Sequence, residues 1–294
     1  MNFKATNFEE RAIHIACADS WLCGIVSVPE QTFSRGVVIV VGGPQYRVGS
    51  HRQFTLLARH LAAQGVPVMR FDYRGMGDST GETRTFESVD DDLRCAIDQF
   101  MAEVPHLKQV VLWGLCDAAS AALFYAYQDP RVTGLILLNP WVRTEEGIAK
   151  ATLKHYYITR LFERDLWQKI LRGRFDYVAT IKSAMALVGN AFLFKKSKVA
   201  DGSETVHQSM SLPDRMYHGL NQFKGRTLVI LSGNDLTGQE FSDLIRSSRK
   251  WQKLISTSNV QRYELAGANH TFSRREWRDQ VADWTCKWIK TEQT

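Results

Sequence analysis

The segment GLCDA contains the side chain best suited to nucleophilic chemistry, the thiol of Cys116. An apolar run that ends at Trp113 predicts a strand before it, and the alanine-rich run 118–128 predicts a helix after it. A nucleophile on such a sharp turn is held in strained backbone geometry, with its side chain clear of the sheet edge. The pattern therefore indicates covalent chemistry at a strand–turn–helix junction.

The neighbours of Cys116 fit such a turn. The strand and helix backbones pass close to each other there, and Gly114 and Ala118 are small enough to allow it. The N-terminus of the following helix favours negative charge on the sulfur. A buried structural thiol is the alternative interpretation, because free cysteine is among the most buried residue types. Ser120 is the one hydroxyl nearby, but it would lie inside the helix.

An imidazole and a carboxylate follow in loops after later predicted strands. His270 stands in GANHTF and Asp235 in SGNDLTG. Ligand sites of open α/β sheets gather at the carboxyl ends of the strands, which is where both loops are expected. Asp235 could accept a hydrogen bond from the imidazole and fix its tautomer, or it could cap the next helix. The earlier strand ends in Asn139, not an acid, so we predict a triad in the chain order Cys116, Asp235, His270.

Two backbone N–H groups are expected to bind the oxyanion of a tetrahedral intermediate. The first belongs to Asp117, directly after the nucleophile. The second belongs to Gly43 or Gln45 in the loop VVGGPQYRVGS, because Pro44 has no N–H. One such donor lowers a barrier by about 3 kcal/mol. The same loop could suggest a phosphate cradle, but it lacks the Lys-Ser/Thr ending of a P-loop.

The elements that must position these residues alternate between short apolar strands and amphipathic helices. This alternation predicts an α/β fold with a mostly parallel, eight-stranded sheet and helices on both faces. Trp277, Val281, Trp284 and Trp288 recur at helical spacing and predict core packing in the last helix. The expected strands are Arg11–Ala18, Trp21–Pro29, Gly36–Val41, Val66–Phe71, Gln109–Trp113, Val132–Leu138, Thr227–Leu231 and Val260–Leu265.

Strand signals disappear between residues 142 and 220. We expect a helical lid there, inserted into a core formed by residues 1–141 and 221–294. The segment 142–220 carries 13 Lys or Arg against 8 Asp or Glu, which is most of the net charge of +6. A solvated helical surface explains such a balance, and so does attraction to an acidic substrate.

Composition narrows the class of protein. The sequence of 294 residues contains no apolar run of the roughly 20 residues that a membrane span needs, and its polar N-terminal segment does not read as a secretory signal. Five cysteines, an odd number, argue against a disulfide framework and favour a reducing cytoplasm. No histidine pair has metal-ligand spacing, and no nucleic-acid-binding motif accompanies the basic residues, so we expect neither metal, cofactor nor nucleic acid.

Taken together, these motifs resemble the α/β-hydrolase superfamily. GLCDA resembles its G-x-S-x-G elbow with Cys for Ser and Ala118 for the second Gly, and DYRGMGDS resembles the loop after its fourth strand. Val41 stands where the superfamily usually has the His of its HG loop. A Cys-His-Asp triad also occurs in dienelactone hydrolases. VVGGPQYRVGSHRQF, FDYRGMGDS and GLCDAAS are most similar to the exosortase A system-associated hydrolases, first type, which accompany exopolysaccharide genes in bacteria.

The resemblance and the residues imply hydrolysis of a small ester or thioester through an acyl-enzyme on Cys116, with an acidic or carbohydrate-linked compound as a possible substrate. A thioester intermediate keeps enough transfer energy to acylate a sugar, so an acyltransferase is one alternative. A catalytically silent binding protein on a hydrolase fold is the other. In DYRGMGDS, Asp72 and Arg74 are expected to tie the loop down and not to take part in chemistry.

Overall fold

The computed structural model describes residues 6–143 and 210–291. The chain divides into one unit of Met1–Val142 with Pro213–Thr294 and a second of Arg143–Leu212. The lid expected at 142–220 therefore falls largely outside the described residues. Helix α7, Leu212–Gln222, is described, and from Pro213 onward it belongs to the first unit, which resumes earlier than the expected residue 221.

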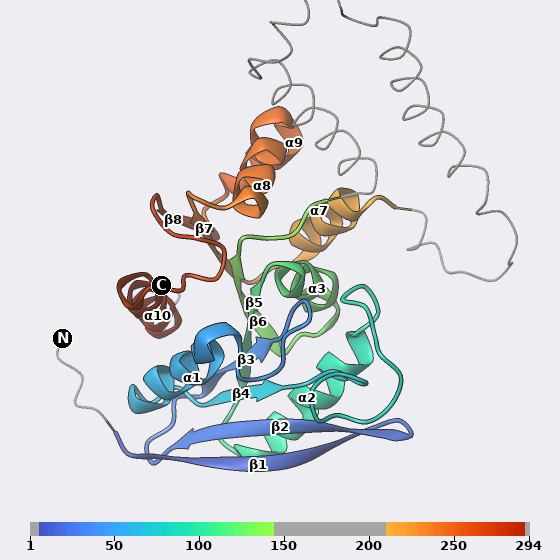
Figure 1. The fold of residues 1–294 in the computed structure, drawn as a ribbon, viewed down its shortest axis with the longest axis vertical. Helices are drawn as coiled ribbons and strands as arrows, with labels where there is room; N and C mark the ends of the chain where they lie inside the picture. Colours follow the sequence, from blue (N-terminus) through green and yellow to red (C-terminus); the bar gives the residue numbers. More distant parts are fainter. Residues whose placement is uncertain (1–5, 144–209, 292–294) are drawn as a thin grey trace, which may run out of the picture. The chain divides into compact units, whose positions relative to one another are not determined.

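The first unit is built on a single sheet of eight strands in the order β1-β2-β4-β3-β5-β6-β7-β8 (Figure 1). β1 and β2 pair antiparallel, β2 pairs antiparallel with β4, and the remaining neighbours are parallel. This confirms the predicted mostly parallel sheet. The strands are β1 Phe8–Cys17, β2 Ser20–Pro29, β3 Arg35–Val40, β4 Val68–Phe71, β5 Gln109–Leu115, β6 Val132–Leu138, β7 Arg226–Ser232 and β8 Val260–Leu265.

Helices cover both faces of the sheet, because its central strands are apolar on both sides. α1 and α10 lie together on one face, where their apolar residues join a core cluster with alternate residues of β3, β5, β6 and β7 (Figure 1). α2 lies against the other face, since a side chain at Gly36 would meet Phe100 of α2. The remaining described helical segments are bounded as follows: η1 Ser50–Arg52, α1 Gln53–Ala63, α2 Asp90–Glu103, α3 Asp117–Tyr125, η2 Ala126–Gln128, α8 Leu236–Ser247, α9 Arg249–Ile255 and α10 Arg275–Lys290.

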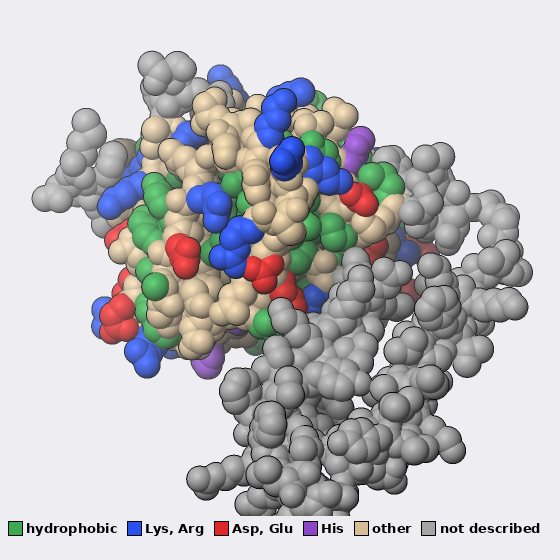
Figure 2. Space-filling model, turned by 90° about the horizontal axis from the view of Figure 1, so that it is seen from above, with side chains coloured by type: hydrophobic (Ala, Val, Ile, Leu, Met, Phe, Trp, Pro, Cys, Tyr) green, Lys and Arg blue, Asp and Glu red, His purple; other side chains and the backbone are tan. Residues whose placement is uncertain are grey.

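The predicted tryptophan stripe of α10 is core packing. Val281 and Trp288 are buried in the core cluster, and Trp277 and Trp284 pack against it half-buried. The outer surface is mixed in charge: Figure 2 shows Lys and Arg side chains interspersed with Asp and Glu over the described part of the face that it presents. No helix among the described residues is long and apolar enough to cross a membrane.

Six parallel strands end at the same edge of the sheet, so the loops that follow β3, β4, β5, β6, β7 and β8 meet there. Hydrogen bonds and ion pairs fix the loop after β4. Asp72 accepts from the backbone N–H of Arg47 at 2.6 Å, and Arg74 donates to buried Asp92 at 2.6 Å. This confirms the structural role predicted for Asp72 and Arg74. The edge carries the three residues of the predicted triad.

Candidate active site

Cys116 occupies a one-residue turn between β5, which ends at Leu115, and α3, which begins at Asp117. Its backbone has φ 64° and ψ −125°, a conformation that costs a non-glycine residue about 1–3 kcal/mol. Three backbone hydrogen bonds hold it. The Cys116 N–H donates to Leu138 at 2.9 Å, and its carbonyl accepts from Ala119 at 3.1 Å and Trp141 at 3.2 Å. The sequence thus builds the strained elbow that was predicted.

The small residues around the turn are needed, as expected. A Cβ placed on Gly114 would lie 2.6 Å from the backbone carbon and oxygen of Ala118, closer than real contacts allow. Ala118 itself is fully buried. Ser120, the alternative hydroxyl, is fully buried in α3 and donates to the carbonyl of Trp141 at 2.7 Å, so its proton is already engaged.

The imidazole of His270 lies between the two other predicted members of the triad. Its Nδ1 donates to Oδ2 of Asp235 at 2.9 Å, and the Cys116 side chain lies close enough to the ring to raise its pKa. The same Oδ2 accepts from the backbone N–H of Gly238 at 2.9 Å, because Asp235 is the N-cap of α8. The same oxygen of Asp235 therefore caps α8 and accepts from the imidazole of His270.

The electrostatics of this trio favour an imidazolium. The hydrogen bond with Asp235 and then the one with Cys116 raise the pKa of His270 to about 10, although burial works in the opposite direction. Burial raises the pKa of Asp235, but the hydrogen bonds from His270 and Gly238 outweigh it, and the net pKa lies below the ordinary 3.8. At neutral pH the two form an ion pair with the thiol side chain beside it.

Asn139 is a further residue of the site that the sequence argument set aside. It is fully buried and has φ 42°. Its Nδ2 donates to Ser232 Oγ at 2.7 Å and to the carbonyl of His270 at 3.1 Å, and its Oδ1 accepts from the Ser232 N–H at 2.9 Å. Asn139, directly after β6, thereby joins the last residue of β7 to the loop after β8. The available signal was an amide directly after an apolar strand, a residue type that tolerates positive φ.

The expected oxyanion donors are arranged differently from the prediction. The Gly43 N–H donates to Oδ2 of Asp117 at 2.8 Å, and the Ala118 N–H donates to Oδ1 at 3.0 Å. The Asp117 carboxylate thus takes up the backbone donor assigned to the oxyanion. The side chain of Gln45 accepts from the Ser50 N–H at 3.0 Å. Burial raises the pKa of Asp117, and the N–H groups of Gly43 and Ala118 partly offset that rise.

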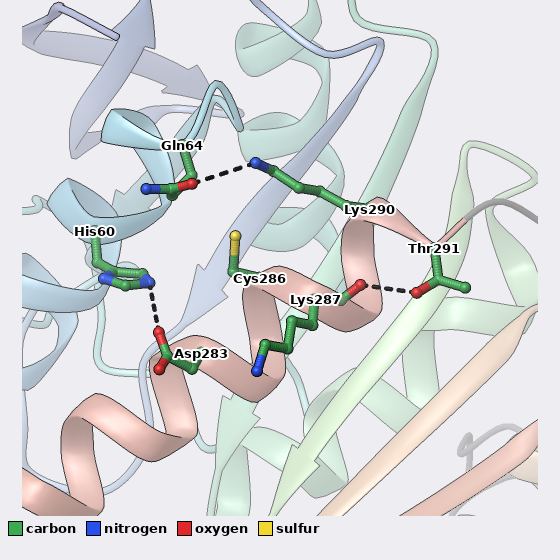
Figure 3. Close-up of a pocket in the computed structure, with 7 residues that line it drawn as sticks. All are labelled: His60, Gln64, Asp283, Cys286, Lys287, Lys290 and Thr291. Carbon is green, nitrogen blue, oxygen red and sulfur yellow. Dashed lines mark hydrogen bonds and ion pairs between the residues drawn. The ribbon is translucent and has the colours of Figure 1, made fainter. Parts of the chain in front are cut away.

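The described residues contain no group of three His, Cys, Asp or Glu side chains arranged to hold a metal ion. A cavity of about 400 Å³ lies between α1 and α10, with the sulfur of Cys286 directed into it (Figure 3). His60 pairs with Asp283 at 3.4 Å on its wall. No member of the predicted triad lines this cavity, so it is separate from the elbow.

Comparison with known proteins places the chain in a family. The sequence pattern of the serine aminopeptidase S33 family matches residues 33–272, from just before β3 to the loop that holds His270. The chain belongs to this family. Its members are hydrolases of the α/β fold, which agrees with the sheet and the elbow described above. No significant match is found among curated protein sequences.

Solved structures show the same fold at low sequence identity. An esterase of Pyrococcus furiosus is 16% identical with a TM-score of 0.61, covering 96% of this chain and 94% of its own. A dienelactone hydrolase from Anabaena variabilis is 16% identical with a TM-score of 0.60, covering 96% and 97%. An α/β serine hydrolase homologue from Coxiella burnetii is 15% identical with a TM-score of 0.56, covering 94% and 96%.

Proposed function

We propose that the chain hydrolyses a small ester or thioester through a Cys116–His270–Asp235 triad. One observation carries this proposal: a single imidazole hydrogen-bonds the Asp235 carboxylate and lies close enough to Cys116, on the strained elbow, for that side chain to raise its pKa. Nucleophile, base and orienting acid within hydrogen-bond reach are the signature of covalent acyl transfer. The esterase and the dienelactone hydrolase among the similar structures support the same class of substrate.

The reaction follows from the geometry. Cys116 attacks the acyl carbonyl carbon as the thiolate, favoured by the imidazolium and by the N-terminus of α3, and the carbonyl π electrons move onto oxygen. Collapse of this intermediate expels the alcohol or thiol, which takes the proton of the His270 imidazolium, and leaves an acyl-thioester. His270 then accepts a proton from water, the hydroxide attacks the thioester carbonyl, and Cys116 leaves as thiolate. Asp235 holds the imidazole in one orientation throughout.

Trapping the acyl-enzyme tests the proposal. Incubation with 4-nitrophenyl acetate should add one acetyl group to the wild-type chain, and peptide mapping should place it on Cys116. Cys116→Ala should abolish both adduct and turnover. Cys286→Ser is the matched control, because that thiol lies in the cavity between α1 and α10 and away from the triad. Full activity of the Cys116→Ala protein on esters and thioesters would contradict the proposal.

A thioester intermediate also allows transfer to an acceptor other than water. The observation that favours this second function is the nucleophile itself, since the elbow carries Cys in a family named for serine. The resemblance to exosortase-associated hydrolases suggests a saccharide acceptor. Supplying candidate sugars to the acylated protein should then give acylated sugar. Release of free acid alone, at an unchanged rate, would leave hydrolysis as the activity.

A further inference from the structure

The side chain of Asp117 occupies a position that the proposed reaction needs for its oxyanion. The carboxylate accepts from the Gly43 N–H at 2.8 Å and the Ala118 N–H at 3.0 Å. Gly42 makes room for it: a Cβ there would lie 2.2 Å from Oδ1 of Asp117. The two glycines and the first turn of α3 thus form a small anion-binding nest, and an acidic side chain of the protein itself fills it.

The charge of this carboxylate opposes the proposed chemistry. A tetrahedral intermediate carries its negative charge within a few ångströms of the nucleophile, and two like charges at such a distance repel strongly away from bulk water. No Lys or Arg in the described ranges forms an ion pair with Asp117. The charged or titratable groups that bear on it are the His270 imidazolium and the buried phenol of Tyr73. While the Gly43 N–H donates to the Asp117 carboxylate, it is not free to donate to the oxyanion.

We propose that the Asp117 carboxylate is an internal competitor of the substrate's carbonyl oxygen and thereby a specificity-determining residue. An acyl group must displace it from the Gly43 N–H, so neutral acyl groups enter and acyl groups with a carboxylate close to the scissile carbonyl are rejected. This inference rests on the proposed function. It also refines the substrate: any acidic portion belongs to the leaving alcohol or thiol and not to the acyl group.

The test compares two reactions of the same thiol in the wild type, Asp117→Asn and Asp117→Ala. Acylation by 4-nitrophenyl acetate requires an oxyanion, whereas alkylation by iodoacetamide does not. Removing the side chain releases the hydrogen bond of a charged acceptor, so Asp117→Ala should raise the acylation rate about 10- to 100-fold. Alkylation should change little. Asp117→Asn keeps an oxygen that accepts from Gly43 but removes the charge, so its acylation should rise less.

Specificity is read with 4-nitrophenyl hemisuccinate, whose acyl group carries a carboxylate. The wild type should prefer acetate to hemisuccinate, and both Asp117 variants should lose most of that preference. Asp243→Asn is the matched control, because Asp243 is exposed on α8 and pairs with Arg246 in the same helix. It should leave both rates and the preference unchanged. Thermal melting shows whether each variant is folded. If Asp117→Ala is unfolded, the acylation rate and substrate preference of Asp117→Asn test the proposal.

The possible failures can be told apart. If the wild type is acylated on Cys116 and neither Asp117 variant raises the ratio of acylation to alkylation, this inference is wrong and the proposed function stands. A fall in both rates would mean that Asp117 has only a structural role. If Cys116 is alkylated but never acylated in any of the proteins, the proposed function and the inference fall together.

Discussion

Replacing Asp235 separates its two roles in the site. Oδ2 of Asp235 accepts from both His270 and the Gly238 N–H, so Asp235→Ala removes the triad acid and the cap of α8 together. Asp235→Asn removes only the charge, because Asn caps helices as well as Asp does. We therefore expect Asp235→Ala to lose about 1 kcal/mol more folding stability than Asp235→Asn.

Activity should respond to the charge and not to the cap. Without the carboxylate, the largest contribution to the raised pKa of His270 is lost, and the ring is free to turn away from Cys116. A misplaced or wrongly protonated general acid–base costs about 100- to 10,000-fold in rate. Both variants should therefore lose a similar factor in kcat/KM on 4-nitrophenyl acetate, although their stabilities differ.

The pH dependence of stability gives an independent readout. The pKa of His270 rises from an ordinary 6.5 to about 10 on folding, so its stabilisation is fully present below pH 6.5 and is lost as pH rises to 10. The pKa of Asp235 is lowered below 3.8, so its contribution to folding stability is present above pH 3.8 and is lost on acidification. The difference in unfolding free energy between wild type and Asp235→Asn should be largest between these limits. An equal difference from pH 5 to pH 10, with full activity of the Asn variant, would refute the triad role.

Three further predictions concern packing, the loops and the thiols. Gly114→Ala should lower the unfolding free energy by about 1–3 kcal/mol in urea titrations, because its Cβ would lie 2.6 Å from backbone atoms of Ala118. Gly267→Ala should be nearly neutral, because the nearest atom to its Cβ would be 4.0 Å away. Asn139→Ala should lower the unfolding free energy by about 3 kcal/mol and slow acylation, since the amide joins the last residue of β7 to the loop after β8; an unchanged melting temperature would contradict this. The sulfurs of Cys17 and Cys95 lie 2.9 Å apart, so diamide should oxidise them to an internal disulfide by accepting two electrons and two protons. Mass spectrometry should show the loss of two hydrogens, and Cys95→Ser should prevent it.

Much of the fold could be predicted because its signals are local. The central strands are apolar runs, and the observed strand ends differ from the predicted ones by at most a few residues, as where β5 continues to Leu115. The elbow could be predicted because Gly114, Cys116 and Ala118 all lie within one motif of five residues. His270 and Asp235 were placed by their order after strands, since parallel strands bring their following loops to one edge.

The rest depended on contacts between side chains from distant segments, which no local pattern encodes. Asn139 was considered only because an acid could have stood at its position. Its side-chain amide in fact forms hydrogen bonds with residues 93 and 131 positions away. Asp117 was considered only for its backbone N–H. Its carboxylate accepts a hydrogen bond from the N–H of Gly43, which lies 74 positions earlier. This contact is possible because Gly42 has no side chain to fill the space. The Gly43 N–H was predicted as an oxyanion donor, and the carboxylate that accepts from it in the structure was not considered.

The electrostatics of His270 bear on why this elbow carries a thiol. A serine nucleophile needs a neutral imidazole to take its proton, but a histidine with a pKa of about 10 is already protonated at neutral pH. A thiol is a stronger acid than a serine hydroxyl, so a cysteine nucleophile depends less on a neutral imidazole to remove its proton. Asp235 is the first cause of the raised pKa of His270, and Cys116 is the second. Cys116→Ser should therefore be much less active than the wild type at pH 7, and activity equal to wild type would show that the imidazole is neutral.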